Sequence, residues 1–281
     1  MRLILMVGLA MLAFAANSLL NRLALAGGGI GPSSFAAVRL AAGAATLVAL
    51  AALRPRGFRP GLGPRRAVGV ASLALYMLGF SFAYLTLDAG AGALVLFGAV
   101  QLTMFAGALA LGEQVPARRA LGAGLAFAGL CLLAWPSGAA RLAGSGVALM
   151  AAAGLGWGIY SLAGRGAADP LGDTAANFLL ALPLGLMALV LRPDVVAPGA
   201  AGVGLAALSG AVTSGLGYAL WYACLPRLAA SRAAVAQLTV PVIAALGGAL
   251  LLAETPGPRF WAAAALVIGG VTLSLAGRRP R

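Results

Sequence analysis

The chain has 281 residues, of which 62% are hydrophobic and 41 are glycine, whereas only 9% are charged. Soluble proteins average about 25% charged residues. A soluble domain of this size could not cover its surface with so few, so the composition excludes an ordinary soluble enzyme and a disordered chain. Because a membrane-spanning helix needs about 20 apolar residues, the chain has room for about ten of them and for no soluble domain.

Apolar runs separated by Gly, Pro and Arg clusters predict the membrane-spanning helices in chain order. Runs of this length must be helical in lipid, because each backbone amide needs an internal partner, and they lack the alternation of a β-barrel. The expected helices are 3–25, 33–53, 66–87, 91–111, 118–135, 143–163, 174–191, 201–224, 231–252 and 259–276. The predicted fold class is an all-α integral membrane protein with ten transmembrane helices.

The first expected helix also resembles a secretory signal peptide. Arg2 precedes its apolar run, and Ala24-Leu25-Ala26 imitates a cleavage site. The run is longer than the apolar core of a typical signal peptide, and the segment has a counterpart later in the chain. We therefore expect it to be retained as a spanning helix.

The net charge is +13, and all 19 basic residues are arginine. No basic stripe lies on a foldable polar face, so the charge does not indicate a nucleic-acid partner. With a cytoplasmic amino terminus, 14 arginines fall on the inner side, 4 on the outer side, and Arg39 lies within a span. This asymmetry predicts that both termini are cytoplasmic.

The chain contains an internal repeat. Glu113 and Glu254 each follow an expected helix, and a glycine, Gly129 or Gly270, stands 16 residues after each. Further matches in the same order pair Ala108–Glu113 with Ala249–Glu254, Phe80 and Tyr84 with Tyr218 and Tyr222, and Phe14–Arg22 with Trp157–Arg165. The repeats are assigned to residues 1–138 and 139–281.

Each repeat holds five expected helices. Since five is odd, the two halves enter the membrane in opposite directions, which is the architecture of alternating-access transporters with a site near the midplane. The alternative is that the duplication only built a stable helix bundle.

With these features the chain resembles the drug/metabolite transporter superfamily, specifically its EamA-type ten-helix members, over essentially all of its length. The two halves with their Glu-to-Gly endings carry the resemblance, together with Pro241 and the Trp157-Gly158 pair. The first half departs from the pattern, because Phe14-Ala15 stands where Trp-Gly is typical. The resemblance implies metabolite export across the bacterial inner membrane, and the YddG-like amino-acid exporters are the nearest branch.

Polar residues within the expected helices are few, and each could line a cavity or bond a neighbouring helix, the latter contributing about 0.6 kcal/mol. Gln101, at the centre of the fourth span, favours a cavity. Pro241, on the same face as Gln237, indicates a hinge or an unwound site. Arg39 lies about 9 Å from the outer surface at 1.5 Å per residue. The other polar candidates are Asn17, Asn21, Ser161, Thr213 and Ser214.

Aromatic residues recur every four positions on the third and eighth expected helices. The topology places Tyr84 near the outer face and Tyr222 near the inner face, which suggests an outer and an inner gate, although such stripes also serve packing or an interfacial belt. The predicted substrate cavity comprises Asn17, Tyr76, Met77, Phe80, Gln101, Met104, Trp157, Tyr160, Ser161 and Gln237. The predicted gates are Tyr84, Tyr218, Trp221 and Tyr222, with Pro241 as the hinge.

The scarcity of ionisable residues within the expected helices limits the possible functions further. No Asp or Glu lies deep within an expected helix, there is no His, and Arg39 is the one cation placed deep within an expected helix. We therefore expect neither an enzyme nor a cofactor or metal site, but a monomeric exporter of neutral or zwitterionic metabolites such as aromatic and neutral amino acids, in contact with membrane lipid. The alternatives are a multidrug exporter of hydrophobic compounds and a non-transporting membrane scaffold.

Overall fold

The computed structural model of the protein describes residues 2–55, 57–58, 61, 63–110, 112, 116–134, 141–164, 167–228 and 236–275. Every regular element in these ranges is a helix, which confirms the all-helical class. The helices are α1 (Arg2–Ala26), α2 (Pro32–Ala52), α3 (Pro64–Ala83), α4 (Ala89–Ala110), α5 (Ala117–Ala134), α6 (Arg141–Ala163), α7 (Pro170–Leu191), α8 (Ala200–Leu208), η1 (Ser209–Leu216), α9 (Gly217–Cys224), η2 (Leu225–Arg227), α11 (Thr239–Leu252) and α12 (Pro258–Leu275). Within the described chain, seven helical segments are long and apolar enough to cross a membrane.

Two helix ends differ from the prediction by about four residues, and a side-chain cap explains one of them. Helix α7 was expected to begin at residue 174, but it begins at Pro170, because the Asp169 carboxylate accepts the Gly172 N–H at 3.0 Å and caps the first turn. Helix α3 was expected to continue to residue 87, but it ends at Ala83. A turn follows, and α4 begins at Ala89, whose N–H donates to Glu254 Oε2 at 2.8 Å.

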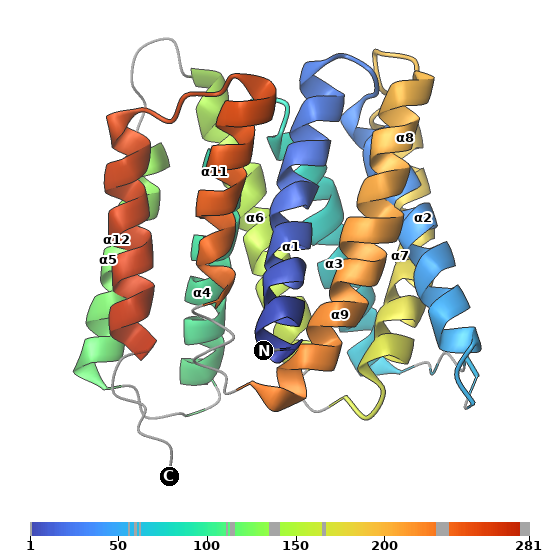
Figure 1. Ribbon diagram of the computed structural model, residues 1–281, viewed down its shortest axis with the longest axis horizontal. Helices are drawn as coiled ribbons and strands as arrows, with labels where there is room; N and C mark the ends of the chain where they lie inside the picture. Colours follow the sequence, from blue (N-terminus) through green and yellow to red (C-terminus); the bar gives the residue numbers. More distant parts are fainter. Residues whose placement is uncertain are drawn as a thin grey trace.

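The helices run alternately up and down the bundle (Figure 1). Helix α1 begins and α12 ends at the lower end of the view, whereas the connection from α3 to α4 and that from α11 to α12 lie at the upper end. We call these the lower and upper ends throughout. Helix α1 rises from the lower end, whereas α6 descends from the upper end.

Close helix contacts depend on small residues on α6. A Cβ at Gly154 would lie 2.7 Å from the backbone oxygen of Leu96, and one at Gly158 would lie 2.6 Å from Thr103 Cβ, both on α4. On another face of α6, a Cβ at Gly156 would lie 2.7 Å from the backbone oxygen of Ser72 on α3. The spacing Gly154-x-x-x-Gly158 predicts such a small-residue contact, and the structure confirms it.

Helix α8, the π-helix η1 and helix α9 follow one another without a break and form one membrane-spanning segment, Ala200–Cys224, with η1 in its middle. A Cβ at Gly210 would lie 2.3 Å from the backbone oxygen of Arg39, so glycine allows η1 to approach α2 closely. The polar candidates Thr213 and Ser214 lie in this segment. Irregular backbone of this kind is tolerated at membrane depth only where neighbouring groups satisfy it, and it is frequent at functional sites.

The outer surface of the bundle is strongly apolar. Large aliphatic side chains point outward from several helices, among them Ile4 at 78%, Val190 at 77% and Leu250 at 84% exposure. Exposed apolar surface on this scale is typical of a protein embedded in lipid.

Candidate functional site

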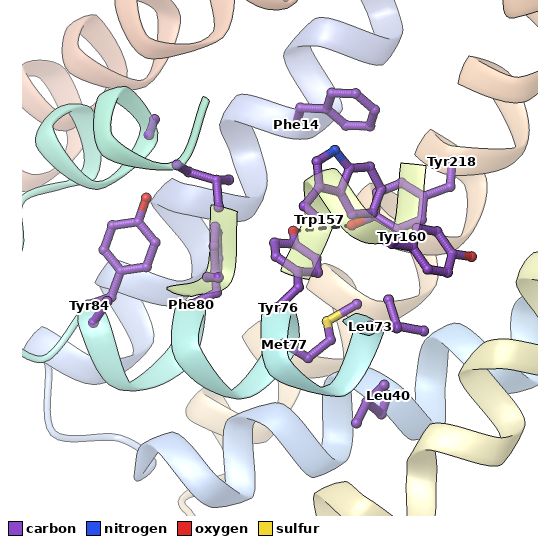
Figure 2. Packing of buried hydrophobic residues seen from close by; sticks show 14 of the residues in the cluster. Phe14, Leu40, Leu73, Tyr76, Met77, Phe80, Tyr84, Trp157, Tyr160 and Tyr218 are labelled. Atoms are coloured by element: carbon purple, nitrogen blue, oxygen red, sulfur yellow. Dashed lines mark hydrogen bonds between the residues drawn. The ribbon is translucent and has the colours of Figure 1, made fainter. Parts of the chain in front are cut away.

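A line of aromatic rings in mutual contact runs through the interior of the bundle (Figure 2). Along α3, the Tyr84 and Phe80 rings lie 4.8 Å apart, and the Phe80 and Tyr76 rings lie 5.4 Å apart. The line continues to α6, where the Trp157 ring lies 5.0 Å from Tyr76 and 5.5 Å from Tyr160. The spacing of four residues on α3 places its three rings on one helical face, as the sequence predicts.

The centre of this line encloses a small cavity of about 10 Å³. That volume is enough for about one water molecule. The rings of Tyr76, Trp157 and Tyr218 meet around it, with Trp157 and Tyr218 4.9 Å apart. The lining residues are Phe14, Asn17, Tyr76, Phe80, Leu96, Phe97, Trp157 and Tyr218. The central cavity is therefore mainly aromatic, with few polar groups.

A larger cavity of about 280 Å³ lies at the lower end of the bundle. Its polar residues are bonded to each other: Arg66 pairs with Asp173 at 2.6 Å and donates to Asn177 Oδ1 at 3.1 Å. Asn177 Nδ2 in turn donates to the Tyr160 hydroxyl at 3.3 Å. Tyr222 also lines this cavity. Because Tyr160 stacks on Trp157, these two rings separate the lower cavity from the central one.

The upper end is closed by a cluster of side chains around Tyr84, which is fully buried. Arg22 donates to Glu254 Oε1 at 2.7 Å and to the Tyr84 carbonyl at 3.1 Å, and its guanidinium lies 3.5 Å from Asp88. Partial burial, together with the charge of Glu254, raises the pKa of the Asp88 carboxyl above its ordinary value, against the opposing effect of Arg22.

A network of hydrogen bonds joins four helices beside the central cavity. Arg39 on α2 is fully buried; its Nε donates to Ser214 Oγ at 3.0 Å and its Nη2 donates to the Tyr76 hydroxyl at 2.9 Å. Ser214 donates to Asn17 Oδ1 at 3.3 Å, and the Tyr76 and Tyr218 phenols are 3.1 Å apart. Thus α1, α2, α3 and the segment formed by η1 and α9 meet at one polar centre.

The structure brings some of the predicted site residues together and separates others. Asn17, Tyr76, Phe80, Trp157 and Tyr218 line the central cavity. Tyr160 and Tyr222 line the lower cavity, and Tyr84 lies at the closed upper end. Gln101 and Met104 instead line a third cavity, of about 60 Å³, between α4, α5 and α12.

The remaining predicted residues lie outside these cavities. Met77 is buried near Leu40 and Leu73 (Figure 2), and Ser161 donates back to the Trp157 carbonyl at 2.7 Å. The Trp221 ring packs edge-on against Phe14 at 5.8 Å. Gln237 precedes the turn at Leu238, and Pro241 lies in the first turn of α11, which follows it. The repeat residue Glu113 lies outside the described residues.

Sequence reasoning missed the polar residues of the lower cavity. Asn177 is an amide within an expected helix, so its position is a signal that could have been used. Arg66 and Asp173 are 107 residues apart, and nothing local in the sequence links them.

Comparisons with known proteins identify sequence relatives and a solved structure of similar fold. The chain is 48% identical over 280 residues to an uncharacterized protein of Pseudomonas aeruginosa, covering 100% of this chain and 96% of that one. It is 26% identical over 212 residues to an uncharacterized transporter of Archaeoglobus fulgidus, covering 73% of this chain and 74% of that one. A solved crystal structure shares the fold, with a TM-score of 0.72, 21% identity and 99% of both chains covered.

A family profile identifies the class of protein. The profile of the EamA-like transporter family matches twice, over residues 1–135 and 144–276, and so covers nearly the whole chain. A multi-pass membrane protein built of apolar helices fits that family. The chain therefore belongs to the EamA-like transporter family, within the drug/metabolite transporter superfamily.

Proposed function

We propose that this protein exports small neutral or zwitterionic metabolites, foremost aromatic and neutral amino acids, by alternating access. The observation that carries the proposal is the central cavity, whose aromatic walls lie between a closed upper end and an open lower cavity. Aromatic walls with a few convergent polar groups suit partly apolar solutes such as aromatic and neutral amino acids.

An inverted pair of five-helix repeats, residues 1–138 and 139–281, underlies the proposed mechanism. The family profile matches each half separately, which supports the duplication. Helices in equivalent positions of the two halves pack against each other: α2 with α7, α4 with α11, and α5 with α12. The contact of α3 with α6 also has an equivalent, which is the contact of η1 and α9 with α1. The opposite directions of α1 and α6 support the inversion (Figure 1).

In this proposal the substrate enters from the lower cavity. It passes the stacked Trp157 and Tyr160 rings and occupies the centre, which must widen because its present volume is about 10 Å³. Tyr84 is the upper gate, and Tyr218, Trp221 and Tyr222 form the lower gate. Pro241, beside the turn at Leu238, is the hinge of the second half.

The orientation follows from the arginine distribution. The starts of α3 and α5 lie at the lower end and carry Arg65, Arg66, Arg118 and Arg119, so we place that end and both termini in the cytoplasm of a bacterial cell, with the bundle in the inner membrane. The open lower cavity then faces the cytoplasm, as the loading state of an exporter should. Among the described carboxylates, all five lie at helix ends or in connections, which favours efflux down a concentration gradient.

Proteoliposomes test this function. Vesicles loaded with unlabelled phenylalanine or leucine are expected to take up the same labelled amino acid by counterflow, whereas protein-free vesicles are not. Equal uptake by both kinds of vesicle, across a panel of neutral and aromatic amino acids, would overturn the proposal. Selective counterflow of hydrophobic drugs instead would assign the protein to multidrug export.

A further inference from the structure

The central network holds a buried positive charge without a counterion in the described chain. The side chain of Arg39 is fully buried, yet the five described carboxylates are engaged elsewhere. Asp88 and Glu254 lie beside Arg22, Asp169 pairs with Arg54, Asp173 pairs with Arg66, and Asp194 accepts the N–H groups of Ser33 and Ser34. A buried charge is strongly unfavourable unless it is paired, so a missing counterion indicates that a ligand supplies one.

The guanidinium also keeps unused donors. Nε and Nη2 of Arg39 donate to Ser214 and Tyr76, but Nη1 is buried and has no hydrogen-bond partner among the described residues. The Tyr76 and Tyr218 hydroxyls share one hydrogen bond, and neither donates to any other described group. One phenolic proton of this pair is therefore also without an acceptor. Unsatisfied buried donors beside a cavity call for an acceptor from outside the chain.

The surroundings of Arg39 join this donor set to the central cavity. Its guanidinium carbon lies 4.8 Å from the centre of the Phe80 ring and 5.4 Å from that of Tyr76, and both rings line the cavity. Cation–π contacts of this kind hold the charge without neutralising it. No described carboxylate lines the central cavity to receive an ammonium group.

We propose that Arg39 is the anion-binding residue of the central site, and that the substrate is recognised by its carboxylate. The Arg39 guanidinium and a phenolic proton of the Tyr76–Tyr218 pair hold the carboxylate, and the aromatic walls hold the apolar body. An α-amino group has no charged partner there, so the ligand class is aromatic and apolar monocarboxylates, of which amino acids are one group. This inference rests on the proposed function and narrows its substrates.

Four related probes separate the two charges of an amino acid. L-Phenylalanine carries both charges, 3-phenylpropanoate only the carboxylate, L-phenylalaninamide only the ammonium, and 2-phenylethylamine likewise only the ammonium. Binding to the purified full chain in detergent is measured by isothermal titration calorimetry. We expect the two acids to bind with similar affinity, and the amide and the amine to bind about ten- to a hundredfold more weakly, the loss expected for a charge-assisted contact.

Variants of Arg39 test whether this residue causes the preference for probes that carry a carboxylate. Arg39→Gln is expected to remove the discrimination between 3-phenylpropanoate and the amide, whereas Arg39→Lys keeps the charge and retains the preference at reduced affinity. A purely structural role would lower stability in both variants and leave the ratio of acid to amide affinity unchanged. If Arg39→Gln does not give a monodisperse protein, Arg39→Lys decides the question. Because lysine lacks the forked donors of arginine, a ratio of acid to amide affinity lower than in the wild type supports the inference, and an unchanged ratio overturns it.

The outcomes also separate this inference from the proposed function. Equal binding of acid and amide by the wild type, or an unchanged ratio in Arg39→Gln, would overturn the inference and leave amino-acid export standing. Binding of 3-phenylpropanoate without any counterflow of amino acids would overturn the proposed function and support the inference. Binding of none of the four probes would overturn both.

Discussion

The side chain of Arg22 on α1 lies 2.7 Å from Glu254 Oε1, although the two residues are 232 positions apart in the chain. Glu254 uses its other carboxylate oxygen to accept the N–H of Ala89 at the start of α4. Arg22 also donates to the Tyr84 carbonyl. One pair thus joins α1, the turn between α3 and α4, and the connection after α11, directly above the proposed upper gate.

Breaking this pair should open the upper end. Arg22 and Glu254 side chains are 19% and 11% exposed, so Glu254→Gln removes a partly buried charged hydrogen bond worth about 1.5–3 kcal/mol. We expect a cysteine introduced at buried Ser81, in a chain lacking Cys131 and Cys224, to react about ten- to a hundredfold faster with a membrane-impermeant thiol reagent.

Arg54→Gln is the matched control for this experiment. It breaks the Arg54–Asp169 pair, 2.8 Å long, at the lower end of the bundle. Labelling at residue 81 should not rise in this variant. An unchanged labelling rate in Glu254→Gln would show that the Arg22–Glu254 pair does not hold the upper end closed.

Asp88 should make stability depend on pH. Its folded-state pKa is raised above the ordinary 3.8, mainly by burial and then by Glu254, so the folded state binds this proton more readily than the unfolded chain does. Its contribution to stability is full below pH 3.8 and is lost as the pH rises through the raised pKa. Asp88→Asn should therefore raise the melting temperature in detergent more at pH 7 than at pH 4. A shift of equal size at both pH values would contradict this origin.

The sequence predicts the helices well because lipid leaves apolar runs no other structure. It misses the start of α7, because this start depends on the cap by Asp169. It also misses the end of α3, and it gives no sign that Glu254 accepts the first N–H of α4. The four-residue spacing of Tyr76 and Phe80 predicts their shared face. Helix α4, by contrast, is apolar all round, so its sequence could not indicate which neighbour Gln101 would face.

Substitution of Gly158 should loosen the contact between α4 and α6. A Cβ there would lie 2.6 Å from Thr103 Cβ, so Gly158→Val overpacks the contact and should cost about 1–3 kcal/mol. Gly144→Val on the same helix is the control, because a Cβ at Gly144 meets nothing within 4 Å. Thermal unfolding in detergent is the measurement. Equal destabilisation by the two substitutions would show that the cost is one of helix propensity rather than of packing.

Trp157→Ala should impair transport more than folding of the bundle. Its ring lies between the central and lower cavities and contacts Tyr76, Tyr160 and Tyr218 at 4.9–5.5 Å. Loss of these ring contacts, at about 0.5–1.5 kcal/mol per ring pair, should lower phenylalanine counterflow about tenfold. Trp261→Ala, 46% exposed on α12, removes an indole far from the site and should keep counterflow near the wild-type rate. Equal counterflow rates for the two variants would show that Trp157 does not line the route of the substrate.

Gln101→Ala distinguishes a substrate cavity on α4 from the central one. The sequence favours a cavity role for Gln101, and the side chain does line a cavity, with Met104 and Arg119, between α4, α5 and α12. That space is separate from the aromatic centre, which α4 lines with Leu96 and Phe97 instead. We therefore expect Gln101→Ala to keep phenylalanine counterflow within about twofold of the wild type, a difference of about 0.4 kcal/mol.

Phe97→Ala, which opens the central wall, should change the apparent affinity for phenylalanine. A strong loss of counterflow in Gln101→Ala with normal transport in Phe97→Ala would move the route of the substrate to the α4–α5–α12 cavity.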